Sequence, residues 1–125
     1  MTSEELFAAT SIKTWSTVTS RLEEILSSLD DGALQAEVSP GRNRVYYILG
    51  HLAAHHDRLL SLLGLGERLH PELDDIFINK PDRTFPDEVS GSDLRAIFTK
   101  VNARVTSAIR ALDPVALLQL SLIHI

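Results

Sequence analysis

The sequence contains no cysteine, and this absence removes several kinds of chemistry at once. Disulfide bridges, thiolate nucleophiles and cysteine-ligated metal sites are all excluded. A cysteine-free composition suits a reducing compartment, and we expect the protein to be cytoplasmic. The start of the chain, Thr2-Ser3-Glu4-Glu5, is acidic, whereas a secretory signal begins with basic residues and an apolar segment.

Long apolar runs and excess positive charge are also missing. No apolar run approaches about 18 residues, so we expect no membrane span. Lys and Arg number 12 against 17 Asp and Glu, so a basic face for nucleic acid is not expected. The sequence has neither a glycine-rich phosphate loop nor a serine nucleophile elbow. A chain of 125 residues with 44% hydrophobic residues is typical of one folded domain.

Three long segments show the apolar spacing of helices. Their apolar residues recur at alternating steps of three and four, which places them on one helix face. The segments are Ser3–Leu29, Asn43–Leu63 and Ser92–Leu112. Alternation with a period of two is missing over any useful length, so the sequence predicts an all-α domain. We expect Thr2 with Glu5 to cap the first helix, and Gly32 to end it.

The connections predict how the helices are arranged. Gly32–Arg42 has strong turn chemistry, and Asn43 and Ser92 are expected to cap the helices that follow. Pro71–Phe77 is expected to form a short helix, with Phe77 and Phe85 holding the following loop against the body. Such links favour an up-and-down bundle of three long helices plus a short one. Asp113-Pro114 can start a fourth helix.

The last six residues, Leu120–Ile125, form a string that matches the in-frame translation of a common transposase-derived sequencing adapter. We therefore expect a helical bundle over residues 1–119 and a non-native tail over residues 120–125. On this hypothesis the natural C-terminal part is missing, and His124 is left out of any candidate site.

Three of the five histidines lie between Gly50 and Asp57, inside the second predicted helix. His51 and His55 are four residues apart, so both project from one side of the helix and could chelate one metal ion. Such pairs are more often ordinary bundle residues, and a metal site needs a third ligand. The nearby candidates for that ligand are His70, Asp74 and Asp75.

The residues around the pair predict other roles. His56 falls near the centre of the apolar stripe and is expected in the core, hydrogen-bonded to a polar group. Asp57 could orient an imidazole or pair with Arg58. Trp15 is expected in the core. Arg42 and Arg44 flank a helix start, which suits an anion site or, more commonly, a solvated helix end. Asp74-Asp75 is expected to be an exposed acidic turn.

Two stretches resemble DinB-like proteins. Gly41-Arg42-Asn43 leading into Tyr47-Ile48-Leu49-Gly50-His51-Leu52-Ala53-Ala54 is similar to the second helix of that family. Gly64-Leu65-Gly66-Glu67-Arg68-Leu69-His70-Pro71-Glu72-Leu73 is similar to a linker found in one branch of it. The resemblance covers most of Ser3–Gln119.

The resemblance implies a four-helix bundle, up-up-down-down in many members and often a homodimer. It also implies a divalent metal, zinc or nickel, held by His51 and by a late His-x-x-x-His that this sequence lacks. His55 would then lie beside the ligand, and the bundle would lack part of its fourth helix. Relatives include transferases and an isomerase that use bacterial low-molecular-weight thiols, which implies a small-molecule substrate. The alternatives are a non-catalytic helical dimerisation module and an inactive truncated fragment.

Overall fold

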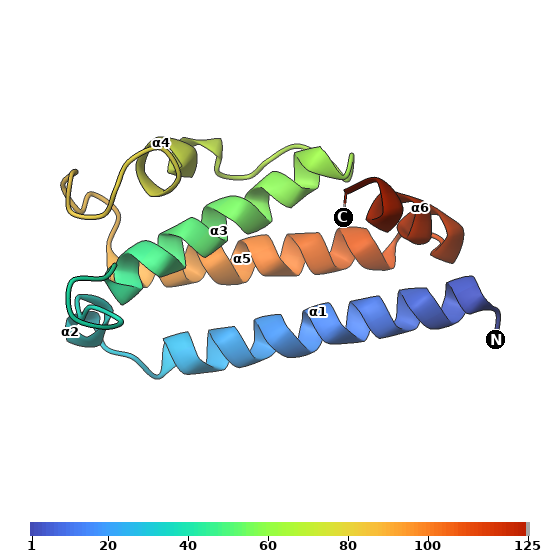
Figure 1. Cartoon of the computed structure of the whole chain (residues 1–125), viewed down its shortest axis with the longest axis horizontal. Coiled ribbons are helices and arrows are strands. Elements are labelled where there is room, and N and C mark those ends of the chain that lie inside the picture. The colour runs from blue at the N-terminus through green and yellow to red at the C-terminus, as the bar shows by residue number, and fades with distance from the viewer. Residues whose placement is uncertain (125) are drawn as a thin grey trace.

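The computed structural model describes residues 1–124, with side chains for residues 1–119, and these residues fold into helices (Figure 1). Within them the only β pairing is an isolated bridge between Glu37 and Arg44, which confirms the all-α prediction. No described helix combines the length and the apolar character needed to cross a bilayer. The helices are α1 (Ser3–Ser27), α2 (Asp31–Leu34), α3 (Val45–Leu62), α4 (Asp74–Phe77, after a 3-10 turn at Pro71–Leu73), α5 (Gly91–Arg110) and α6 (Pro114–His124).

α5 lies between α1 and α3 and packs against both (Figure 1). α1 runs antiparallel to α5. The indole of Trp15 donates to Thr106 near the end of α5, at 2.7 Å, whereas Arg95 near the start of α5 donates to the carbonyl of Leu29 just after α1, at 3.0 Å. α3 runs parallel to α5. The hydroxyl of Tyr46 at the start of α3 donates to the carbonyl of Val89 just before α5, at 2.6 Å. The up-and-down order therefore holds from α1 to α3, and residues 63–90 must then travel back along the bundle.

Two of the predicted helix starts are confirmed. The hydroxyl of Thr2 accepts from the backbone N–H of Glu5 at 3.1 Å, and the side chain of Glu5 returns the bond, which makes a capping box. The carboxylate of Asp113 accepts from the backbone N–H of Ala116 at 2.8 Å and starts α6. These caps satisfy backbone N–H groups that have no partner inside the helix.

Three of the predicted helix boundaries are wrong. Gly32 does not end α1, because Asp30 caps a separate short helix, α2, that contains this glycine. Ser90, not Ser92, caps α5, since its hydroxyl accepts from the backbone N–H of Asp93 at 3.0 Å. Arg44, and not Asn43, is the residue directly before α3. Its side chain makes contacts with distant segments, which the next residues of the chain do not reveal.

Arg44 is only 5% exposed and joins three segments of the chain. Its guanidinium donates to Asp82 at 2.7 Å, to Asp87 at 2.7 Å and to the side chain of Gln35 at 2.7 Å. The hydrogen bond from Arg44 lowers the pKa of Asp87. Burial would raise the pKa of Asp82, but the bonds from Arg44 outweigh it and the pKa is lowered. The prediction of a solvated helix end was therefore wrong for Arg44.

The apolar stripe of α1 is only partly covered. The buried residues of α1 are Ala8, Thr19 and Leu26, whereas Val18 and Ile25 of the stripe are 51% and 58% exposed. The cause is that α1 has neighbours mainly on the side of α5 and α6. Trp15 is partly buried against a cluster of Leu60, Val101, Val105 and Ala108, as expected for a core residue.

The predicted boundary at Gln119 falls inside α6. The backbone of α6 continues to His124, while the side chains of residues 120–124 and all of Ile125 lie outside the described residues. The adapter origin of residues 120–125 is not tested by this helix and stays a prediction.

The buried Arg44 generates a prediction about stability. Arg44→Met should lower the free energy of unfolding by about 3–5 kcal/mol, because it leaves the buried carboxylate of Asp82 without its positively charged partner. Urea denaturation followed by circular dichroism measures the change. Arg42→Met is the matched control, because Arg42 is exposed and precedes the same helix, and it should change stability by less than about 0.5 kcal/mol. Equal effects of the two substitutions would contradict the assigned role of Arg44.

Candidate metal centre

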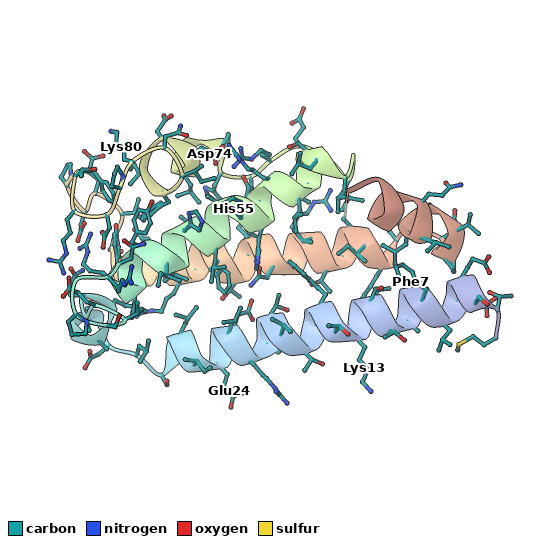
Figure 2. All side chains as sticks on the ribbon, in the orientation of Figure 1. Phe7, Lys13, Glu24, His55, Asp74 and Lys80 are labelled. Atoms are coloured by element: carbon teal, nitrogen blue, oxygen red, sulfur yellow. The ribbon has the colours of Figure 1, made fainter. Side chains whose placement is uncertain are left out.

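His51 and His55 lie together on α3, as their spacing predicts. Their ring centroids are 4.3 Å apart and the ring planes meet at 69°. His51 is half-buried, and His55 is exposed on α3, below the Asp74 region of α4 in Figure 2. The structure therefore brings the two predicted ligands to one place that solvent can reach.

His51 is held in one orientation by the backbone of α4. Its Nδ1 lies 2.7 Å from the carbonyl oxygen of Phe77. Because a carbonyl only accepts, Nδ1 must carry the proton, and Nε2 keeps its lone pair. Metal-binding histidines commonly donate their second ring N–H in this way, which fixes the ring and raises the basicity of the ligand nitrogen. The imidazole also stacks on Tyr47, with ring centroids 6.0 Å apart.

Gly50 allows this hydrogen bond to form. The ring of Phe77 lies against Gly50, and a Cβ at this position would overlap that ring. Phe77 itself is fully buried and lies beside Tyr46, Tyr47 and Phe85. The Gly-His pair at positions 50 and 51 thus has a physical basis, because the glycine lets α4 approach closely enough for the Phe77 carbonyl to reach the histidine.

The surroundings of His55 disfavour its protonated ring. Burial and the neighbouring His51 lower the pKa of His55. A neutral imidazole is the form that binds metal, since a protonated ring has no free lone pair. His55 can therefore offer a nitrogen ligand.

The predicted third ligands do not join the pair. Within the described residues, no group of three or more His, Asp or Glu side chains is placed to hold a metal ion. Nδ1 of His70 lies 2.8 Å from the carboxylate of Glu72. Asp74 is not an exposed acidic residue as predicted, because Arg68 donates to both of its carboxylate oxygens at 2.7 Å. Asp75 remains exposed.

Asp57 has a role that the sequence did not reveal. It is fully buried, accepts from Nε of Arg68 at 3.0 Å, and accepts from the backbone N–H groups of Leu69 at 2.8 Å and His70 at 3.0 Å. The predicted contact with Arg58 or an imidazole is therefore wrong. Helical spacing could have indicated that Asp57 is buried. It follows Ala53 by four residues and precedes Leu60 by three, so it lies on the same helix face as these two fully buried residues.

His56 is separate from the pair and belongs to the interior. It lies between Trp15, at 4.9 Å, and Phe98, at 5.5 Å between ring centroids. Nδ1 of His56 donates to the side-chain oxygen of Asn102 at 2.6 Å, and the amide nitrogen of Asn102 donates to Glu23 at 3.0 Å. This confirms the prediction of a core histidine bound to a polar group, and it joins α3, α5 and α1.

The close contact at Gly50 generates a prediction about the site. Gly50→Ala should displace Phe77, loosen its bond to His51, and cost about 1–3 kcal/mol through overpacking. Urea denaturation gives the stability, and competition with a chromophoric chelator gives the zinc affinity, which should fall. Gly32→Ala is the matched control, because a Cβ there meets its nearest atom at an ordinary 3.4 Å. Wild-type stability and zinc affinity for Gly50→Ala would contradict the assigned role of the glycine.

A profile of the DinB superfamily matches residues 14–121, which include α3 with both histidines and the α4 segment that orients His51. No curated protein matches the chain. The profile confirms the resemblance that the two sequence stretches indicate. Because it matches most of the chain, the protein belongs to the DinB superfamily.

Proposed function

We propose that this protein binds a divalent metal ion, zinc or nickel, through His51 and His55. The observation that carries the proposal is the hydrogen bond from Nδ1 of His51 to the Phe77 carbonyl, because it leaves Nε2 free and aimed by a rigid partner. Two imidazoles one helical turn apart are suitable ligands for either metal. The proposal requires at least one further ligand from outside the described residues.

The chemistry that we propose is thiol-dependent transfer or isomerisation of a small molecule. When bound, a divalent ion would lower the pKa of a coordinating thiol, so that the thiolate is present at neutral pH. The thiol would come from a low-molecular-weight cofactor, since the chain has no cysteine. His51 and His55 would hold the ion, and the Phe77 carbonyl would keep His51 in its ligating tautomer.

Metal analysis of purified protein tests the proposal. Wild type, dialysed against zinc or nickel and then against buffer, should retain metal by inductively coupled plasma mass spectrometry. His51→Ala should abolish this retention, and His55→Ala should weaken it. His56→Ala is the control histidine, because its ring faces Asn102 in the interior. If wild type retains no more metal than His51→Ala, the catalytic proposal loses its basis.

A second proposal, a non-catalytic helical module that forms homodimers, is favoured by a different observation. An apolar groove along α1 is lined by Phe7, Thr10, Ser11, Thr14, Trp15 and Val18. Figure 2 shows Lys13 and Glu24 pointing away from the bundle on another side of the same helix. Val18 and Ile25 lie within about 20° of each other around the helix axis, at the margin of this groove. An exposed apolar face of this kind favours self-association.

Sedimentation velocity over a range of protein concentrations tests this second proposal. Wild type should sediment as a dimer or larger species, and Val18→Lys should shift it toward the monomer. Leu6→Lys is the matched control, because Leu6 is as exposed as Ile25 but lies about 120° from Val18 around α1. A wild-type protein that stays monomeric at every concentration would contradict self-association.

A further inference from the structure

A cleft of about 570 Å³ lies between α1 and α5, and most of the side chains that line it are polar. The wall from α1 consists of Ser16, Thr19, Ser20 and Glu23, which recur at helical spacing and therefore share one face. Among the described residues, α3 contributes nothing to this cleft, so it is separate from the histidine pair. Helices in a bundle normally meet through apolar faces, so packing alone does not explain this polar one.

The opposite wall, from α5, has the same polar character. Its polar residues are Thr99, Asn102, Thr106, Ser107 and Arg110. At one end of the cleft, Nδ2 of Asn102 donates to the carboxylate of Glu23 at 3.0 Å. Arg110 follows Asn102 by eight residues, which is about 12 Å along the axis of α5. The cleft therefore has a carboxylate at one end, a guanidinium toward the other, and hydroxyl groups between them.

Several polar groups of the cleft are withdrawn from bulk solvent. Asn102 is 2% exposed and Thr19 is 5% exposed. Oγ of Ser16 is also buried, and it has no hydrogen-bond partner among residues 1–119. Buried hydroxyl groups in native proteins normally have a partner, so this one needs an explanation. A turn of Ser16 about its single side-chain torsion would direct Oγ to a ligand in the cleft.

A second hollow adjoins the cleft and supplies the charge for an anion. It shares Ser16 and Arg110 with the cleft and is also lined by Lys13, Arg21 and Glu24. Three cations and one carboxylate give this hollow a net charge of +2, although the whole protein has a formal net charge of −5. None of the three cations forms an ion pair with a residue among 1–119. A phosphomonoester, with a charge of about −1.5 to −2 at neutral pH, matches this surplus.

We propose that the cleft between α1 and α5 binds a small sugar phosphate. The phosphate contacts Arg110 and Lys13, where the surplus positive charge lies. The sugar hydroxyls lie among the serine and threonine hydroxyls, because each of these groups can both donate and accept. Glu23 accepts from the sugar hydroxyl furthest from the phosphate. This site is independent of the proposed metal site and adds a second ligand class to the protein.

Isothermal titration calorimetry with three matched probes tests the proposal. Glucose 6-phosphate carries both recognised parts, whereas glucose and inorganic phosphate carry one each. Wild type should bind glucose 6-phosphate at least roughly tenfold more tightly than either of the others, because only the ester engages both the cations and the hydroxyls. Wild-type protein that binds glucose 6-phosphate no more tightly than inorganic phosphate would overturn the proposal.

Arg110→Gln tests the phosphate end of the cleft. It should weaken the binding of glucose 6-phosphate by roughly tenfold, since hydrogen bonds to charged groups are of that strength. Arg110→Lys keeps the charge without the guanidinium fork, so its affinity should be intermediate. Lys100→Gln is the matched control, because it removes a positive charge from the same helix at a residue that lines a different cleft, and it should bind as wild type does.

Ser16→Ala tests the sugar end and separates a ligand contact from a structural one. It should weaken the binding of glucose 6-phosphate by roughly threefold to tenfold and leave that of inorganic phosphate unchanged. Its urea midpoint should not fall, because Oγ has no partner to lose within residues 1–119. Wild-type affinity for glucose 6-phosphate in both Ser16→Ala and Arg110→Gln would contradict the site. His51→Ala should bind glucose 6-phosphate normally, so the outcome does not depend on the metal proposal.

Discussion

The site depends on how residues 63–90 are held against α3. Because α3 and α5 are parallel, the chain must cross the length of the bundle between them, and a crossing segment exposes many backbone groups that need partners. The buried carboxylate of Asp57 provides several of these partners. It accepts from two successive backbone N–H groups of the crossing and from Arg68, whose remaining nitrogens hold Asp74 at the start of α4.

These contacts also fix the orientation of His51. Asp74 begins α4 and Phe77 ends it, so fixing Asp74 fixes the carbonyl that orients His51. Gly50 contributes from the other side by letting the ring of Phe77 approach α3. Arg44 plays the corresponding part at the far end of the crossing, where it holds Asp82 and Asp87. The polar interior of the protein therefore serves mainly to place one irregular segment.

Periodicity was sufficient to predict the long helices, because apolar spacing is a local property of the chain. Proline in the first helical turn, also a local signal, predicted the short helix at Pro71–Phe77 and the start of α6 at Pro114. It could not predict the parallel packing of α3 and α5, since the direction of a helix depends on contacts distant in sequence. Nor could it separate Arg44, which is buried, from Arg42, which is exposed, because their carboxylate partners lie some 40 residues away.

For the candidate site, the sequence predicted where the histidines lie on their helix but not which residues they contact. The helical spacing of His51 and His55 was enough to bring their rings together, and the position of His56 was enough to place it in the core. The partners of His51 and His56 were not predictable, because Phe77 and Asn102 reach them from other helices.

The most direct test of the account is the tautomeric state of His51 before and after zinc is added. Long-range proton–nitrogen NMR of the histidine side chains, recorded near neutral pH on wild type and on His51→Ala for assignment, reports it. The account predicts that His51 carries its proton on Nδ1 and that zinc shifts the Nε2 resonance. A proton on Nε2, or a His51 spectrum that zinc leaves unchanged, would contradict it.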